Sequence, residues 1–130
     1  MVYEERCPFC RKVKEGSELI QKNEEAVAFY DAYPSADGHI LVVPRRHVAR
    51  VAELEEPEYS LLFRLVREIV EGVEDEACTI GVNDGSAAGQ TIGHVHVHVI
   101  PRNEDDGGVG KGGIRWVLPQ TAPYWETTTS

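Results

Sequence analysis

A chain of 130 residues can bury a hydrophobic core within one domain, and its 42% hydrophobic and 27% charged residues are ordinary for a globular protein. The formal net charge of −9, from 22 acidic and 13 basic side chains, argues against nucleic acid or an anionic membrane as the main partner. No hydrophobic run approaches the length of a membrane span, the N-terminus lacks a signal-peptide pattern, and three cysteines cannot all pair. We therefore expect a single domain over residues 1–130 in the reducing cytoplasm, with thiols free or bound to metal.

The first half of the chain predicts one short helix and three strands. The helix follows the sequence CPFC and ends at Gly16. The strands are expected over residues 18–22, 25–31 and 39–44. A turn joins the first two strands, and a loop rich in Pro, Ser, Asp and Gly precedes the third, which Pro44 ends.

The second half predicts one long helix between strands. The helix runs from Pro57 to about Glu74, with apolar side chains at helical spacing at Tyr59, Leu62, Phe63, Val66, Ile69, Val70 and Val73. Two further strands are expected over residues 77–83 and 93–101, and a glycine-rich tail over about 103–130 contains an apolar segment around Trp116. The spacing is too short for repeated crossover helices, so the pattern predicts an α+β domain with an antiparallel sheet.

Cys7 and Cys10 form a CxxC motif close to the N-terminus. A redox motif would follow a strand in a thioredoxin-like unit, and no strand is predicted before Cys7. A tetrahedral zinc site would need two more ligands, for which His47 and one of the later histidines are candidates. Unliganded thiols are the remaining interpretation.

His94, His96 and His98 alternate with Val95, Val97 and Val99 in the sequence GHVHVHVIPR. On a strand, the imidazoles would share one face and the valines the other, against the long helix. Three interpretations are open. The imidazoles can form a solvated strand face, they can bind a metal ion, or one of them can be a nucleophile whose neighbours contact the phosphate that it attacks. A neutral imidazole has a free lone pair near pH 7, provided that an acceptor holds its other N–H. The preceding loop, NDGSAAGQT, favours phosphate chemistry because its backbone N–H groups are accessible.

The sequence HVHVHVI, with CPFC and AVAFYDAYPSADGHILVVPRRHV in the same order, resembles the histidine triad (HIT) family of nucleotide hydrolases and transferases. The resemblance implies a five-stranded antiparallel sheet with two helices. It also implies a homodimer with one ten-stranded sheet, in which the tail lies near the partner's site. Trp116 and Trp125, in an exposed segment, would suit such an interface.

The resemblance also implies the roles of individual residues. His96 would attack the α-phosphorus of a nucleotide and form a covalent nucleotidyl intermediate, His98 would contact the phosphate, and His39 would be the additional histidine beside that strand. Residues implied to hold the nucleotide are Asp31, for ribose, and Asn83, Gln90 and Thr91, around the phosphates. The implied ligands of one structural zinc ion are Cys7, Cys10, His47 and His94.

Two substrate classes fit this chemistry, namely dinucleoside polyphosphates such as Ap4A and nucleoside phosphoramidates. Lys111 or Arg115 would offset the acidic net charge, and magnesium can accompany the substrate. Two other functions are open: a metal enzyme or carrier that uses all three triad histidines as ligands, and a non-catalytic nucleotide-binding protein.

Overall fold

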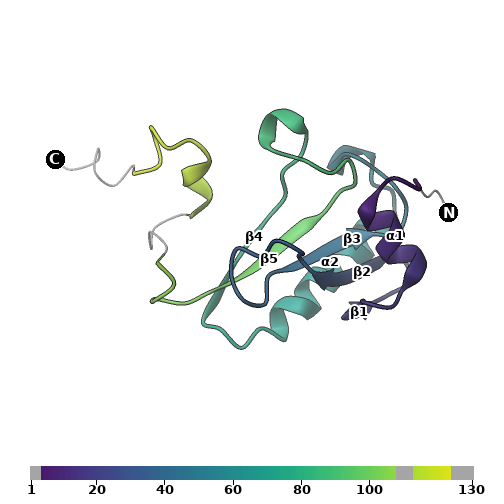
Figure 1. Cartoon of the computed structure of the whole chain (residues 1–130), viewed down its shortest axis with the longest axis horizontal. Helices are drawn as coiled ribbons and strands as arrows, with labels where there is room; N and C mark the ends of the chain where they lie inside the picture. The colour runs from purple at the N-terminus through teal and green to yellow at the C-terminus, as the bar shows by residue number, and fades with distance from the viewer. Residues whose placement is uncertain (1–3, 108–112, 124–130) are drawn as a thin grey trace.

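The computed structural model describes residues 4–107 and 113–123 and contains one antiparallel sheet of five strands (Figure 1). The strands are β1 (Gln21–Lys22), β2 (Ala26–Tyr30), β3 (Ile40–Pro44), β4 (Ala77–Gly81) and β5 (Val97–Arg102). Their order in the sheet is β1-β2-β3-β5-β4, and every neighbouring pair is antiparallel. The predicted α+β class is therefore confirmed.

The two helices, α1 (Pro8–Glu15) and α2 (Glu58–Glu71), cover opposite faces of the sheet (Figure 1). Alternate residues of β2 and β3 serve the two layers: Ala28 and Val42 pack with α2, whereas Phe29 and Leu41 pack with α1. Both strands are thus apolar on both faces, which explains their nearly continuous hydrophobic sequences.

Helix α1 begins inside the CPFC motif, earlier than predicted from the sequence. Cys7 is its N-cap and accepts a hydrogen bond from the Cys10 N–H, while Pro8 occupies the first turn, where it needs no backbone donor. Gly16 ends the helix with a φ of 67°, as expected of a glycine C-cap. The cysteine pair is therefore held by a helix start.

Helix α2 presents a somewhat different face to the sheet from the one predicted. Leu62, Val66 and Ile69 are buried, but so is Leu65, which the predicted stripe left out. Tyr59 and Phe63 are 48% and 37% exposed and contact each other with ring centroids 5.3 Å apart. Tyr59 and Phe63 share the helical spacing of the buried residues but lie outside the buried core, because the helix turns its Leu65 side toward the sheet.

The histidine segment enters the sheet later than predicted, because β5 starts at Val97. Val95, Val97 and Val99 do pack in the cluster that α2 covers, as their alternation predicted. His94 and His96 precede the strand, and the backbone N–H of Val95 donates to the carbonyl of Val48 at 2.8 Å. As a result, the His94 carbonyl is outside the strand ladder and can accept a side-chain hydrogen bond.

Three short 3₁₀ helices complete the described fold, at Val51–Glu53, Ser86–Ala88 and Gly113–Val117. The last belongs to the tail, lies beside β4, and is followed by exposed apolar residues such as Leu118. Among the described residues, no helix is both long and apolar enough to cross a membrane. Lys111 and Trp125 lie outside the described residues.

Candidate functional site

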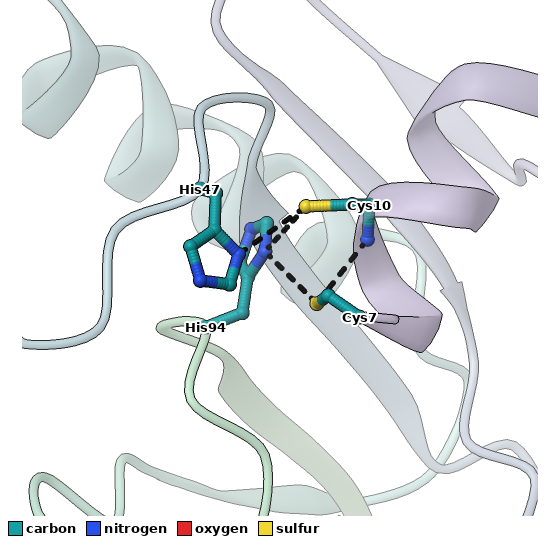
Figure 2. A group of neighbouring side chains, drawn as sticks. All are labelled: Cys7, Cys10, His47 and His94. Atoms are coloured by element: carbon teal, nitrogen blue, oxygen red, sulfur yellow. Dashed lines mark hydrogen bonds between the residues drawn. The ribbon is translucent and has the colours of Figure 1, made fainter. Parts of the chain in front are cut away.

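Cys7, Cys10, His47 and His94 converge on one point beside the start of α1 (Figure 2). Their ligand atoms all lie within 4.8 Å of one another, and both sulfurs are 3.5 Å from the Nδ1 atom of His94. The Nδ1 atom of His47 is 3.3 Å from the Cys10 sulfur. Ligand atoms in a tetrahedral zinc site are also roughly 3.5 Å apart, given metal bonds of about 2.0 to 2.3 Å. We call these four residues the tetrad, and they can hold a metal ion.

The surroundings of His94 orient it as a ligand. Its Nε2–H donates to the carbonyl of Pro44 at 2.7 Å, which leaves the lone pair on Nδ1, the atom that faces the sulfurs. Burial lowers the pKa of His94 to about 4, so the ring is neutral near pH 7. Burial likewise raises the pKa of the Cys10 thiol, and a cation would supply the charge that this buried thiolate needs.

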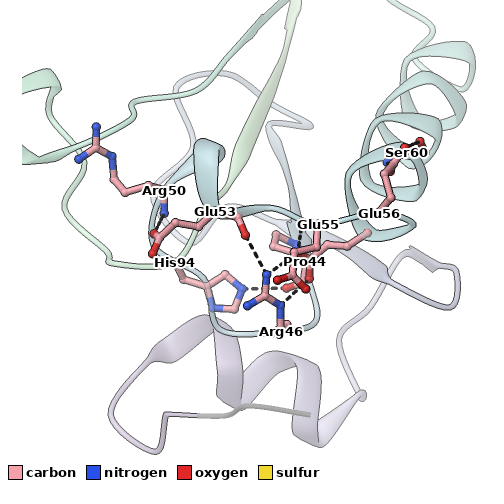
Figure 3. Close-up of polar contacts among 9 residues, drawn as sticks. Pro44, Arg46, Arg50, Glu53, Glu55, Glu56, Ser60 and His94 are labelled. Atoms are coloured by element: carbon pink, nitrogen blue, oxygen red, sulfur yellow. Dashed lines mark hydrogen bonds and ion pairs between the residues drawn. The ribbon is translucent and has the colours of Figure 1, made fainter.

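An ion pair between half-buried Arg46, labelled in Figure 3, and the buried carboxylate of Glu58 supports the loop that carries His47. Arg46 donates to both carboxylate oxygens of Glu58, at 2.8 and 3.0 Å, and also to the carbonyl of Glu53. Burial alone would raise the pKa of Glu58, but the hydrogen bonds and charge of Arg46 keep it below its ordinary value. The pair ties the start of α2 to the residue preceding His47.

His96 has one ring nitrogen committed and the other free. Its Nδ1–H donates to the carbonyl of His94 at 2.8 Å, so the lone pair is on Nε2. Within residues 4–107 and 113–123, no hydrogen-bond partner is recorded for that Nε2 atom. The ring is 6% exposed and lies 5.0 Å from the ring of His98, measured between centroids.

Hydrogen bonds also fix the tautomers of His39 and His98. The backbone N–H of Ser35 donates to Nδ1 of His39 at 3.0 Å, so His39 carries its proton on Nε2. That Nε2 lies 3.0 Å from Nδ1 of His98 and 3.5 Å from a carboxylate oxygen of Asp31. His98 accepts through Nδ1 and therefore carries its own proton on Nε2, a buried atom with no partner among the described residues. A donor is thus held ready beside His96.

Burial keeps this chain of imidazoles neutral. It lowers the pKa of His39, and the negative charge of Asp31 opposes the change only in part. It also lowers the pKa of His98, with a further decrease from the neighbouring His96 and His39. Neutral rings preserve the alternation of donors and acceptors that runs from Ser35 to His98.

A cavity of about 460 Å³ opens in front of His96 and His98 on the α1 side of the sheet. Asp31 and Thr91, two of the residues that the resemblance implied for nucleotide binding, line it. Its apolar walls include Phe9 and Tyr33, and Lys12 contributes a positive charge. These three residues were missed in the sequence, although the position of Phe9 between the two cysteines was a usable signal.

The other two predicted nucleotide-binding residues lie in different settings. Asn83 is exposed and lines an adjoining cavity of about 440 Å³ together with His39 and His98. Gln90 is turned into its own loop: its amide oxygen accepts from the Gly85 N–H at 2.7 Å, and its amide nitrogen donates to the carbonyls of Ala49 and Ile92. The side chain of Gln90 therefore fixes the shape of the loop.

The triad histidines separate into different groups. His94 joins the tetrad, whereas His98 groups with Asp31 and His39, and His96 belongs to neither set of potential ligands in the described residues. Asp31, His39 and His98 have ligand atoms close enough for a metal ion, but their facing nitrogens already bond to each other. This arrangement argues against a metal centre built from all three triad histidines.

Comparison with known proteins identifies the family. The model of the HIT domain matches residues 12–105. The chain is 40% identical over 95 residues to the asymmetrical bis(5'-nucleosyl)-tetraphosphatase of Schizosaccharomyces pombe, covering 70% of this chain and 52% of that protein. It therefore spans about half the length of that relative. It is also 33% identical to adenosine 5'-monophosphoramidase hnt1 of the same organism, covering 82% of this chain and 81% of the relative.

A solved structure gives the same result for the fold. The crystal structure of a Zn-bound histidine triad family protein from Mycobacterium smegmatis superimposes with a TM-score of 0.71 at 28% identity. The match covers 78% of each chain. The family model, the curated relatives and the fold agree, and the chain belongs to the HIT family.

Proposed function

We propose that the protein is a nucleotide hydrolase or nucleotidyl transferase that cleaves its substrate at the α-phosphate through a covalent intermediate on His96. The observation that carries the proposal is the state of His96, whose Nδ1–H is held by a backbone carbonyl while Nε2 faces a cavity without a partner in the described part of the chain. The names of the two fission yeast relatives support nucleotide hydrolysis.

In the first step, Nε2 of His96 forms a bond to the α-phosphorus, and the bond from phosphorus to the leaving group breaks. The ring becomes positively charged, and the His94 carbonyl stabilises that charge through the bond to Nδ1–H. In the second step, water or phosphate attacks the phosphorus, and the bond to Nε2 breaks. The imidazole returns to its starting state.

His98 and the surrounding loop would hold the phosphate. The Nε2–H of His98 is a buried, unpaired donor among the described residues, and a phosphate oxygen in the cavity would accept from it. We assign Asp31 to ribose hydroxyls, and Asn83 and Thr91 to the phosphates. Gln90 acts on the phosphates by holding the loop, since its amide is bonded to backbone groups. Lys12, which also pairs with Glu18, lines the cavity and would bring a positive charge near the phosphates.

We assign zinc to the tetrad, in a structural role. Two thiolates and two imidazoles make a closed tetrahedral set, and the four ligand atoms lie within 4.8 Å of one another. A bound ion would join α1 to the segment before β5, and it takes no part in the chemical steps proposed above. Magnesium remains a prediction about the bound substrate. Reduced thiols are required for this site, so we propose a cytoplasmic location.

We also propose that the chain forms a homodimer through the edge strand β4. Ile80 on this strand is 43% exposed, and Tyr59 and Phe63 on α2 are partly exposed too. A second copy pairing along β4 would extend the sheet to ten strands, and it would lie near the tail segment Gly113–Val117, which contacts β4. Light scattering on the purified chain tests this proposal.

The deciding experiment is rapid quenching of the protein with Ap4A or with an adenosine phosphoramidate, followed by mass spectrometry. We expect an adduct of AMP mass that maps to His96 and is absent from the His96→Ala variant. An adduct on another residue, or turnover that persists in His96→Ala, would refute the assignment. If AMP binds but neither substrate turns over, the protein is a nucleotide-binding module.

A further inference from the structure

Phe9 lies between the two cysteines of the tetrad, and its backbone is held by the same turn. The N–H of Cys7 donates to the Glu4 carbonyl at 3.0 Å, and the N–H of Arg11 donates to the Cys7 carbonyl at 3.1 Å. The Cys7 sulfur also accepts from the Cys10 N–H. A constraint on the two sulfurs is therefore also a constraint on the backbone that carries the Phe9 ring.

The same ring contacts both the tetrad and the proposed nucleophile. Its edge-on contacts join it to His94, with ring centroids 5.9 Å apart, and to His96, with centroids 5.0 Å apart. Phe9 is 6% exposed and packs on Phe29 behind it, at 5.5 Å between centroids. Close-packed rings of this kind have little room to move independently, so a shift of Phe9 changes the space available to His96.

Phe9 is also a wall of the cavity in front of His96. A nucleoside in that cavity would pack against Phe9, while an ion in the tetrad would hold the turn that carries it. When one ligand restrains the ring, the second ligand binds to a ring that is already ordered. The second binding event therefore costs less conformational entropy. Such a coupling between binding free energies is necessarily reciprocal.

We propose that Phe9 is a positioning residue that links the tetrad to the reaction cavity, so that a metal ion in the tetrad and a nucleotide in the cavity strengthen each other's binding. The nucleotide half of this statement rests on the proposed function. The positioning of His96 by Phe9 does not, because the ring contacts exist without a substrate.

The first test measures zinc affinity by chelator competition with and without AMP, and AMP affinity with and without zinc. We expect each ligand to increase the affinity of the other about 5-fold or more in the wild-type protein. Phe9→Ala should reduce this factor to near 1, and Phe9→Leu should retain part of it. Cobalt absorption verifies that the tetrad still binds metal in each variant.

Val13→Ala is the matched control. Val13 is 5% exposed and belongs to the same apolar cluster under α1, but it does not line the cavity in front of His96. This variant should lose stability and keep the wild-type coupling factor. Equal factors in wild type and Phe9→Ala would overturn the proposal, as would wild-type protein that binds both ligands independently.

The second test needs no nucleotide. NMR relaxation of the His96 ring at fixed pH should show that removal of zinc makes the ring more mobile in the wild type and in Val13→Ala. In Phe9→Ala the ring should be mobile with or without zinc. If zinc still restrains the ring in Phe9→Ala, Phe9 is not the link. Failure to bind AMP would refute the proposed function and leave this second test to decide the role of Phe9.

Discussion

His94 and His96 are two residues apart, yet they have opposite chemical settings. In His94, Nε2–H bonds to the Pro44 carbonyl and Nδ1 faces two sulfurs, so both nitrogens are committed. In His96, the His94 carbonyl holds Nδ1–H and Nε2 faces a cavity. The comparison teaches that the role of each imidazole follows from the nitrogen that a backbone carbonyl holds.

The largest effect should come from removing the free nitrogen. We expect His96→Ala to lower kcat by roughly 10⁴-fold or more, as loss of a nucleophile does in enzymes with covalent intermediates. Zinc content should not change, since His96 is not one of the four tetrad residues. The melting temperature should decrease, because the buried ring packs against Phe9 and His98. Kinetics, calorimetry and metal analysis on the same sample provide the check. A variant that loses zinc together with activity would break the distinction between the two histidines.

His94→Ala should show the complementary pattern. Loss of a direct ligand should weaken zinc binding by at least roughly 100-fold, because even residues that only orient ligands contribute 10- to 100-fold. In buffer that contains zinc, we expect His94→Ala to melt at a lower temperature than the wild type, because the bound ion stabilises the wild type. Residual activity should exceed that of His96→Ala. Unchanged zinc affinity would show that the tetrad is not the metal site.

Acid should destabilise the metal-free protein, prepared with a chelator, through protonation of His94. The unfolded ring binds a proton below about pH 6.5, whereas the folded ring does so only near pH 4, so stability is full above pH 6.5 and falls as the pH decreases toward 4. Integrated over this window, the loss is roughly 3 kcal/mol. Urea unfolding at several pH values measures it. A His94→Gln variant should lose most of this dependence, and a flat wild-type profile would contradict the burial of a neutral ring.

His39→Ala should have the smallest effect of the four. It removes the N–H that donates to Nδ1 of His98, so the tautomer of His98 is no longer fixed. We expect kcat to fall about 10- to 100-fold, at or below the lower limit of the usual contribution from a positioned proton donor, because His39 acts only through His98. His39→Gln, which keeps an amide donor, should recover part of the loss. An unchanged kcat in His39→Ala would mean that His98 needs no such partner.

Much of the fold was predictable from local patterns. Two-sided apolar strands and a Gly-terminated helix predicted β2, β3 and α1, and the alternation of valines correctly placed Val95, Val97 and Val99 under α2. The start of α1 and the buried face of α2 were not predictable from such patterns. The first depends on the Cys7 cap, and the second depends on the packing of Leu65. Such contacts involve residues distant in sequence or side-chain bonds that periodicity does not report.

The sequence by itself determined which residues are candidates for the chemistry: a cysteine pair, five histidines and the order in which they occur. Only the tertiary structure decided how those histidines divide. The carbonyls of Pro44 and His94 and the N–H of Ser35 select the free nitrogen of each ring. Phe9 contacts both His94 of the tetrad and His96 at the cavity. The physical reason is that nearly every residue carries the same backbone N–H and carbonyl groups. Each tautomer is therefore fixed by where a backbone group lies in space, and not by the identity of the residue that carries it.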